Sequence, residues 1–299
     1  MPRTIRPRQR AELYVVDAVS GETRLVHRSG KRALEAPTWT PDGTALVVRA
    51  AGVLYRLPVD GSGELEEIPL LGVPSIGWHV LHPDGETVFV TPANGHIYRA
   101  KLAGGTAHRI TNDHGPRVEH RVHGITADGA MLSYTGAKTK KDGRVNTDVF
   151  LLPATGGEDV RMTDDPIVDG GAELSPDGEW VYFCSERASS KPGHTQLFRM
   201  AMDRVVCEQL TDDKRVDWFP HPSPDGQRVA YLSYGKGTKG RPVDAEVIVR
   251  VLDPDGSKRD LVKVPGGHGT LDAPCWSPDS RYIAYVAYPA KGAEGKPAS

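Results

Sequence analysis

The chain has 299 residues with a formal net charge of −2 at pH 7, 38% hydrophobic residues, 33 glycines and 24 prolines. The balanced charge excludes a general nucleic-acid or anionic-membrane binder, and the apolar content excludes a disordered chain. No apolar run approaches the roughly 18–20 residues that a membrane helix needs, and no apolar stretch of a secretory signal follows the basic start. Three widely spaced cysteines, Cys184, Cys207 and Cys275, predict buried thiols in a cytoplasmic protein rather than disulfides or a thiolate zinc site.

Two strands are predicted first, within residues 11–27, in "AELYVVDA" and "ETRLVHR". One pattern then occurs six times: a segment that ends in a tight turn, followed by a β-rich run. In the first five repeats a third strand follows, and a short fourth strand closes the unit. In chain order the turn segments are "APTWTPDG", "GWHVLHPDG", "HRVHGITADG", "GGAELSPDG", "WFPHPSPDG" and "DAPCWSPDS". Proline presets φ, aspartate caps its own backbone and glycine supplies a positive φ, so each segment predicts a tight connection between two strands.

The turns begin 42 to 54 residues apart, at Pro41, Pro83, Ala127, Pro176, Pro224 and Pro278. Four-stranded repeats at such a period predict an all-β fold, a six-bladed β-propeller. The sixth repeat stops after two strands at Tyr288, and residues 11–27 supply its missing outer strands. Pairing of the two ends would close the ring and remove exposed sheet edges. We expect an N-terminal extension at 1–10, one propeller at 11–288 and a disordered tail at 289–299.

The repeats resemble the PD40 (WD40-like) modules of the TolB family, whose mark is a W-S-P-D-G turn followed by an I-A-Y-type strand. The likeness covers residues 11–288. The stretches "WFPHPSPDG", "SPDGEWVYFCSER" and "GGHGT…PCWSPDS" are similar to a bacterial TolB-like subgroup labelled Tol biopolymer transport or translocation proteins. The resemblance implies a propeller that binds a protein or peptide across its face. TolB itself is periplasmic and carries an N-terminal α/β domain, for which this sequence has no room.

Ligand-type side chains recur near the ends of the predicted innermost strands. Four of them come from consecutive repeats: His79, His123, Glu173 and His221. The first two lie four residues before their turns and the last two lie three residues before, an offset that a β-bulge could absorb. Imidazoles and a carboxylate that converge on a channel suit a divalent metal such as Mn, Fe, Ni or Zn. The alternative is that each side chain hydrogen-bonds a neighbouring blade or channel water.

Long basic loops are predicted between the second and third strands of blades 3 to 5, in "GAKTKKDGRVN", "ERASSKPGH" and "GKGTKGRPVD". They would form a rim that attracts an anionic ligand. The candidate ligand-binding residues are Lys138, Lys141, Arg144, Arg187, Lys239, Arg241 and Asp272. His268, in "GGHGTLDAP", leads into blade 6 on the same face and is the candidate catalytic base.

Two functions follow from these patterns. Oligogalacturonate lyases, more distantly similar in their repeats, bind Mn²⁺ through channel histidines and a Gln, although they have seven blades and their ligand pattern does not map here residue by residue. That resemblance implies a divalent-metal-dependent lyase or hydrolase acting on a small anionic or oxidised saccharide. The alternative is a non-catalytic scaffold for a protein partner. Neither function involves nucleic acid or a membrane.

Overall fold

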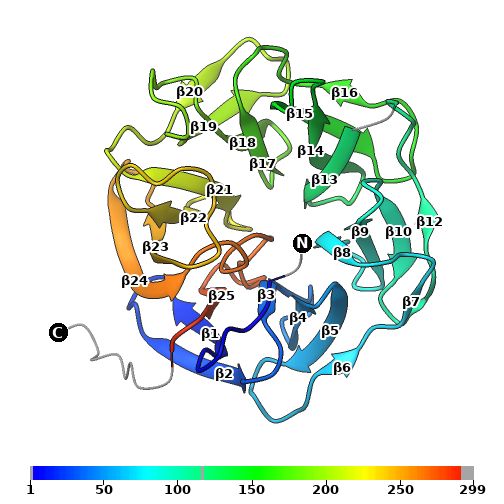
Figure 1. The fold of residues 1–299 in the computed structure, drawn as a ribbon, viewed down its shortest axis with the longest axis vertical. Helices are drawn as coiled ribbons and strands as arrows, with labels where there is room; N and C mark the ends of the chain where they lie inside the picture. Colours follow the sequence, from blue (N-terminus) through cyan, green and yellow to red (C-terminus); the bar gives the residue numbers. More distant parts are fainter. Residues whose placement is uncertain (1–2, 116–117, 291–299) are drawn as a thin grey trace.

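This computed structural model describes residues 3–115 and 118–290. Its strands form six groups arranged in a ring around a central axis (Figure 1), so the predicted all-β six-bladed propeller is confirmed. The described residues form strands and turns without any helix, and therefore without a helix that could cross a membrane.

Blades 1 to 5 each contain a four-stranded antiparallel sheet whose strands follow one another from the centre outward. Blade 1 contains β3 (Leu34–Trp39), β4 (Ala45–Ala50), β5 (Val53–Pro58) and β6 (Glu66–Glu67). Blade 2 contains β8 (Ile76–Leu81), β9 (Thr87–Pro92), β10 (Tyr98–Lys101) and β12 (His108–Arg109). A short parallel pair, β7 (Leu70–Leu71) and β11 (Gly105–Thr106), joins the connections that follow β6 and β10 at the outer rim.

The next three blades repeat the same order. Blade 3 contains β13 (Val118–Ile125), β14 (Met131–Thr139), β15 (Val145–Pro153) and β16 (Val160–Arg161). Blade 4 contains β17 (Asp169–Leu174), β18 (Trp180–Ser185), β19 (Gln196–Ala201) and β20 (Cys207–Gln209). Blade 5 contains β21 (Val216–Pro222), β22 (Val229–Tyr234), β23 (Ala245–Leu252) and β24 (Lys258–Gly266).

Blade 6 joins the two ends of the chain, as predicted. Strand β1 (Ala11–Asp17) lies between β2 (Thr23–Ser29) and β25 (Tyr282–Ala287), and it pairs with β25 from Glu12↔Ala287 to Asp17↔Tyr282. The innermost segment is reduced to one isolated bridge, Trp276↔Ile283. Pro274 and Pro278 flank this bridge, and proline cannot donate the backbone hydrogen bonds that a longer ladder needs.

Each blade packs between two others, so the second strand of a blade is covered on both faces. All six residues of β4, β9 and β22 are buried. The turns have the predicted chemistry: in the fifth, Ser223 Oγ donates to Asp225 Oδ1 at 2.6 Å, and Gly226 has φ +70°. In the sixth turn Ser280 occupies the glycine position at φ +59°. These turns define one face of the ring, which we call the turn face.

The innermost strands of blades 1 to 5 each contain one extra residue relative to their partner strand. These bulges lie between Glu35 and Thr38, Ile76 and Trp78, Val122 and Gly124, Gly170 and Glu173, and Trp218 and His221. A bulge re-aims the side chains next to it. We expected a bulge in only some of these strands to correct the one-residue offset between His79 and His123 on the one hand and Glu173 and His221 on the other. All five strands carry a bulge, so the offset remains. His123 is itself the extra residue, whereas Glu173 and His221 are paired residues that follow their bulges.

The opposite face, where the innermost strands begin, is called the entry face. Residues 186–195 and 235–244 form loops there, as expected. The predicted loop of blade 3 is instead mostly a hairpin, with β14 and β15 paired up to Thr139↔Val145 around a turn at Gly143. Of the predicted N-terminal extension and C-terminal tail, residues 1–2 and 291–299 lie outside the described residues.

Candidate functional site

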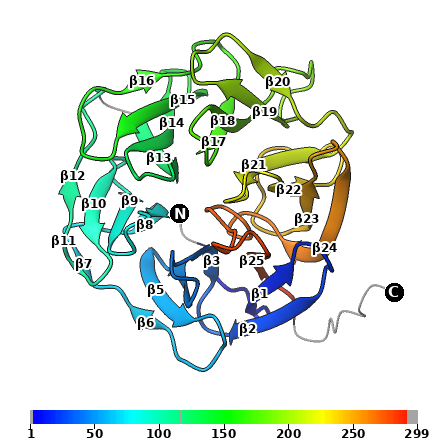
Figure 2. The ribbon, with the colours of Figure 1, turned by 180° about the vertical axis from the view of Figure 1, so that it is seen from behind.

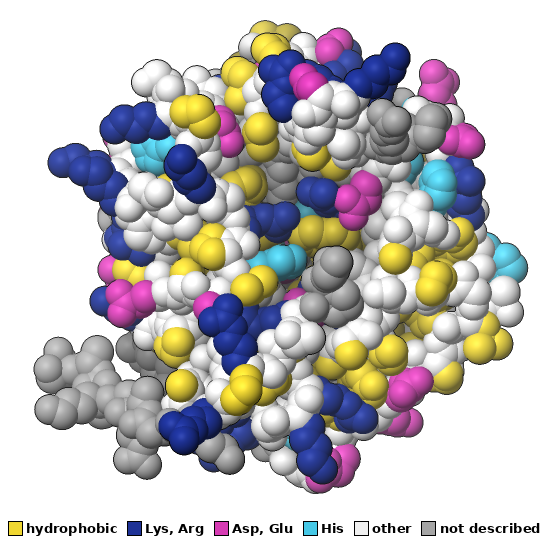
Figure 3. Space-filling view, viewed as in Figure 1, with side chains coloured by type: hydrophobic (Ala, Val, Ile, Leu, Met, Phe, Trp, Pro, Cys, Tyr) yellow, Lys and Arg dark blue, Asp and Glu magenta, His cyan; other side chains and the backbone are white. Residues whose placement is uncertain are grey.

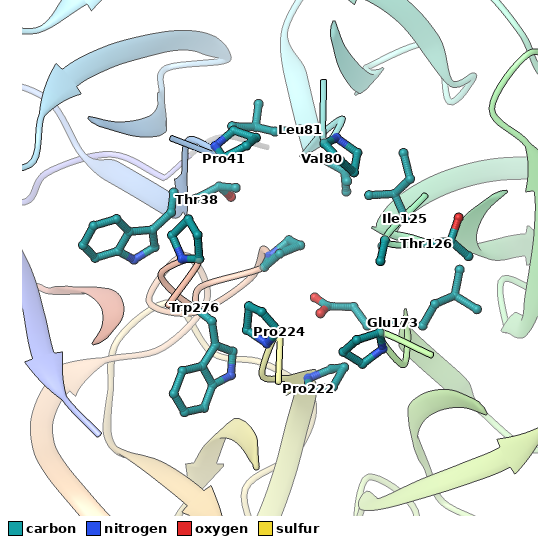
Figure 4. A pocket seen from close by; sticks show the side chains of 18 of the residues that line it. Thr38, Pro41, Val80, Leu81, Ile125, Thr126, Glu173, Pro222, Pro224 and Trp276 are labelled. Atoms are coloured by element: carbon teal, nitrogen blue, oxygen red, sulfur yellow. The ribbon is translucent and has the colours of Figure 1, made fainter. Parts of the chain in front are cut away.

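The turn-face mouth of the channel is an apolar funnel of about 320 Å³ to which all six blades contribute (Figure 4). The turn prolines form its rim, and Leu81, Ile125 and Trp276 line its wall. Glu173 is the one charged residue that lines it, and Figure 4 shows its carboxylate pointing into the open space. Figure 2 views the ring from this same side. A rigid, mostly apolar rim with one carboxylate at its base suits a binding surface.

Glu173 and His221 meet in the channel and join three blades. His221 Nδ1 lies 2.5 Å from Glu173 Oε1 of blade 4, and its Nε2 donates to the Leu271 carbonyl oxygen of blade 6 at 2.9 Å. Both side chains are buried, with 2% and 6% exposure for His221 and Glu173. The backbone oxygen of His221 also accepts from Trp276 Nε1 at 2.8 Å. His221 therefore connects neighbouring blades, which is the alternative to metal binding that the sequence left open.

This pair fixes where the protons of His221 lie. Because Nε2 donates to a carbonyl, that nitrogen carries a proton. Burial alone would lower the pKa of His221, but the charge of Glu173 and its hydrogen bond raise it. Neither ring nitrogen retains a free lone pair for a metal ion.

The two other predicted ligands have different surroundings. His79 is buried and neither of its ring nitrogens has a hydrogen-bond partner among the described residues. Burial, together with the nearby positive charge of Arg49, lowers the pKa of His79 to about 3. The His123 ring packs edge-on against Trp78 at a centroid distance of 4.8 Å, and burial lowers the pKa of His123 well below its usual value. Both imidazoles are therefore neutral at physiological pH.

The structure brings together only two of the four predicted ligands, and those two bind each other. Within residues 3–115 and 118–290, no group of three or more His, Cys, Asp or Glu side chains is arranged to hold a metal ion. The donor set as arranged does not fit a divalent metal, because His221 could coordinate one through Nδ1 only by giving up its contact with Glu173, which is itself one of the predicted ligands.

Two further ion pairs complete the channel wall. Arg49 Nη2 donates to Glu35 Oε1 at 2.9 Å across β3 and β4, and both residues are buried. His268 Nδ1 hydrogen-bonds Asp272 Oδ2 at the entry face. Burial would raise the pKa of Asp272, but the ion pair with His268 lowers it. Sequence reasoning missed Glu35 and Arg49, although two opposite charges inside otherwise apolar strands were a signal for a buried pair.

The entry-face mouth is polar. Figure 3 shows Lys or Arg, acidic and His side chains around a central hollow on the face seen in Figure 1. Three of the predicted site residues, Arg241, Asp272 and His268, belong to this mouth. Arg187 is ion-paired with Asp169 at 3.0 Å. The remaining predicted residues are exposed side chains on the rim: Lys138, Lys141, Arg144 and Lys239.

Arg3, in the predicted N-terminal extension, also reaches this mouth. Its guanidinium lies 3.3 Å from the centre of the Tyr288 ring, pairs with Asp244 at 2.5 Å and donates to the backbone oxygens of Val243 and His268. No periodic pattern in the sequence predicted these contacts. Residues 3–10 therefore form part of the entry face.

Comparison with known proteins gives the family. No family model matches the chain. A protein of Agrobacterium fabrum (strain C58) is 33% identical over 286 residues, which cover 93% of this chain and 92% of the relative. A solved structure from Agrobacterium tumefaciens, described as a TolB, is 30% identical with a TM-score of 0.84, covering 94% of this chain and 99% of that one. The chain belongs to the TolB-like propeller family. An oligogalacturonate lyase solved in complex with manganese shares the fold alone, at 15% identity and a TM-score of 0.59, covering 94% of this chain and 78% of that one.

Proposed function

We propose that this TolB-like propeller is a binding module whose turn-face funnel receives an apolar segment of a protein partner. The observation that carries the proposal is the funnel itself, in which six proline-bearing or alanine-bearing turns surround apolar side chains. Proline restricts the backbone, so the rim is preorganised and loses little conformational entropy on binding. Its volume of about 320 Å³ suits a few side chains of an extended segment rather than a large ligand.

Charge supports the same conclusion. The channel charges below the funnel are already used in the pairs Glu173–His221 and Glu35–Arg49. The funnel therefore offers a partner apolar contact with Leu81, Ile125 and Trp276. The family supports a protein partner rather than a substrate.

Site-specific photo-crosslinking tests this function. A photoreactive phenylalanine derivative at Ala127, on the exposed rim of the funnel, is expected to crosslink one discrete partner in cells that produce the protein. The same group at Lys236, on the entry face, is the matched control and should not crosslink that partner. Adding Ile125→Asp should reduce the Ala127 crosslink by about 30-fold or more, because a charge at a central apolar contact costs at least about 2 kcal/mol.

The melting temperature of Ile125→Asp serves as the folding control in this experiment. Equal crosslinking from Ala127 and Lys236 would contradict the funnel as the binding surface. So would an Ala127 crosslink that persists in a folded Ile125→Asp protein.

A second candidate is a metal-dependent lyase or hydrolase that acts on an anionic saccharide. The fold likeness to oligogalacturonate lyase in complex with manganese and the exposed basic rim on the entry face favour it. It requires a metal bound by His79, His123, Glu173 and His221, with His268 as the base. Because His221 is engaged on both ring nitrogens, we rank this candidate second.

A further inference from the structure

A small cavity lies on the entry face, between blades 3, 4 and 5. Its volume is about 70 Å³. Blade 3 contributes Thr135 and Thr147, blade 4 contributes Asp169, and blade 5 contributes Phe219 and Arg241. The cavity is separate from the turn-face funnel, because no residue lines both.

The walls of this cavity carry polar atoms that the protein leaves unpaired. Among the described residues, no hydrogen-bond partner exists for Thr135 Oγ1, Thr147 Oγ1, Asp169 Oδ1 or Arg241 Nη1, although all four atoms are buried. The two threonines and Asp169 are 2%, 7% and 0% exposed. Buried polar atoms in folded proteins are nearly always paired with protein, water or a ligand, so the three that can donate, Thr135 Oγ1, Thr147 Oγ1 and Arg241 Nη1, indicate an occupant that accepts hydrogen bonds.

Arg241 is the charged residue lining the cavity that has no ion-pair partner among the described residues, so the unpaired charge there is positive. Asp169 is paired with Arg187 at 3.0 Å, and Arg121 is paired with Glu119 at 2.7 Å. Arg241 has no ion pair with a described residue. Its guanidinium instead packs over aromatic rings, 4.8 Å from the centre of Phe219 and 5.3 Å from Trp218 and Trp78. Three rings hold the group in place while one of its nitrogens remains available to a ligand.

We propose that this cavity binds a carboxylate, the anionic group of a small organic acid. A carboxylate presents two coplanar oxygens to a guanidinium, and its remaining lone pairs can accept from the hydroxyls of Thr135 and Thr147. A cavity of about 70 Å³ accommodates a two- or three-carbon acid but not a sugar. One unpaired arginine balances a monoanion, which favours a carboxylate over a phosphate dianion. The site is independent of the proposed partner surface on the opposite face.

Acetate is the probe for this site, with chloride at equal ionic strength as the reference. Trp218 lines the cavity, so the NMR signal of its indole N–H reports binding. We expect saturable binding with a Kd of about 0.1–10 mM, since so few atoms make contact. Arg241→Gln should weaken binding at least about 10-fold and the isosteric Thr147→Val about 3- to 10-fold. Lys236→Gln, an exposed change on the Arg241 loop, should alter Kd less than about 2-fold.

A second measurement distinguishes a free acid from the C-terminus of a peptide as the source of the carboxylate. Trialanine carries the carboxylate at a peptide C-terminus. Tighter binding of acetate assigns the site to free acids, and tighter binding of trialanine assigns it to peptide C-termini. The proposal is overturned if acetate gives no saturable shift up to about 100 mM, a concentration at which even very weak sites fill. It is also overturned if chloride gives the same shift, or if Thr147→Val and a folded Arg241→Gln protein both bind acetate like the wild type.

Discussion

Replacing His221 with alanine is expected to lower the free energy of unfolding by about 3–5 kcal/mol, because the buried Glu173 carboxylate would lose its partner. The hydrogen bond to Leu271 of blade 6 would be lost as well. Urea unfolding followed by tryptophan fluorescence measures the change. The protein should still fold, since the apolar contacts between the outer parts of the blades remain.

Two variants serve as controls for this result. Glu173→Gln should cost less than about 1.5 kcal/mol, because the amide can donate to Nδ1 of a neutral His221. His108→Ala, an exposed change in β12, should change the free energy of unfolding by less than about 0.5 kcal/mol. A loss below about 1 kcal/mol for His221→Ala would contradict its role as a connection between blades.

Deleting residues 1–29 is expected to abolish cooperative folding. The deletion removes β1 and β2 with the buried Leu13 and Val15, leaves β25 with an unpaired edge and uncovers Val286, which packs in the same core cluster. The predicted result is insoluble protein or a melt without a transition, because the lost burial exceeds the roughly 5–15 kcal/mol by which a folded domain is stable. Circular dichroism during heating measures it.

A circular permutant separates ring opening from loss of sequence. In it, residues 9–29 are moved to follow Ala290 through a short linker, which is geometrically feasible because Gln9 already forms a bridge with Ala290. This permutant should fold and melt cooperatively. A deletion variant that stays soluble and keeps the wild-type melting temperature would contradict the closure.

The fold could be predicted from the sequence because the turn chemistry repeats. The four Pro-Asp-Gly turns and their two variants, Ala127-Asp128-Gly129 and Pro278-Asp279-Ser280, mark the end of each innermost segment, and the two-strand deficit after Tyr288 matches residues 11–27. The hairpin of blade 3 was predicted as a loop because its lysines and glycines have low strand propensity, whereas cross-strand pairing as far as Thr139↔Val145 overrides that preference. The contacts of Arg3 could not be predicted, because a single side chain in a short extension belongs to no repeating sequence pattern.

The candidate site was predictable in part. The position of His221 at the channel followed from its place before a turn, and so did that of Glu173. Sequence spacing does not give the distance between side chains on different blades. The sequence therefore cannot distinguish a set of metal ligands from an ion pair. The structure distinguishes them through the 2.5 Å separation of His221 Nδ1 and Glu173 Oε1.

His221 connects three blades through Glu173 and Leu271 rather than holding a metal ion, and ligand binding falls to the two mouths of the channel. Elemental analysis of protein purified without a nickel column tests this claim most directly. We expect less than about a tenth of an equivalent of Mn, Fe, Ni or Zn per chain, because Glu173 and His221 bind each other and no three ligand-type side chains of the described residues converge on one point. Near-stoichiometric metal in the wild type that is lost in His221→Ala would contradict the structural role of His221 and favour the metal-dependent enzyme.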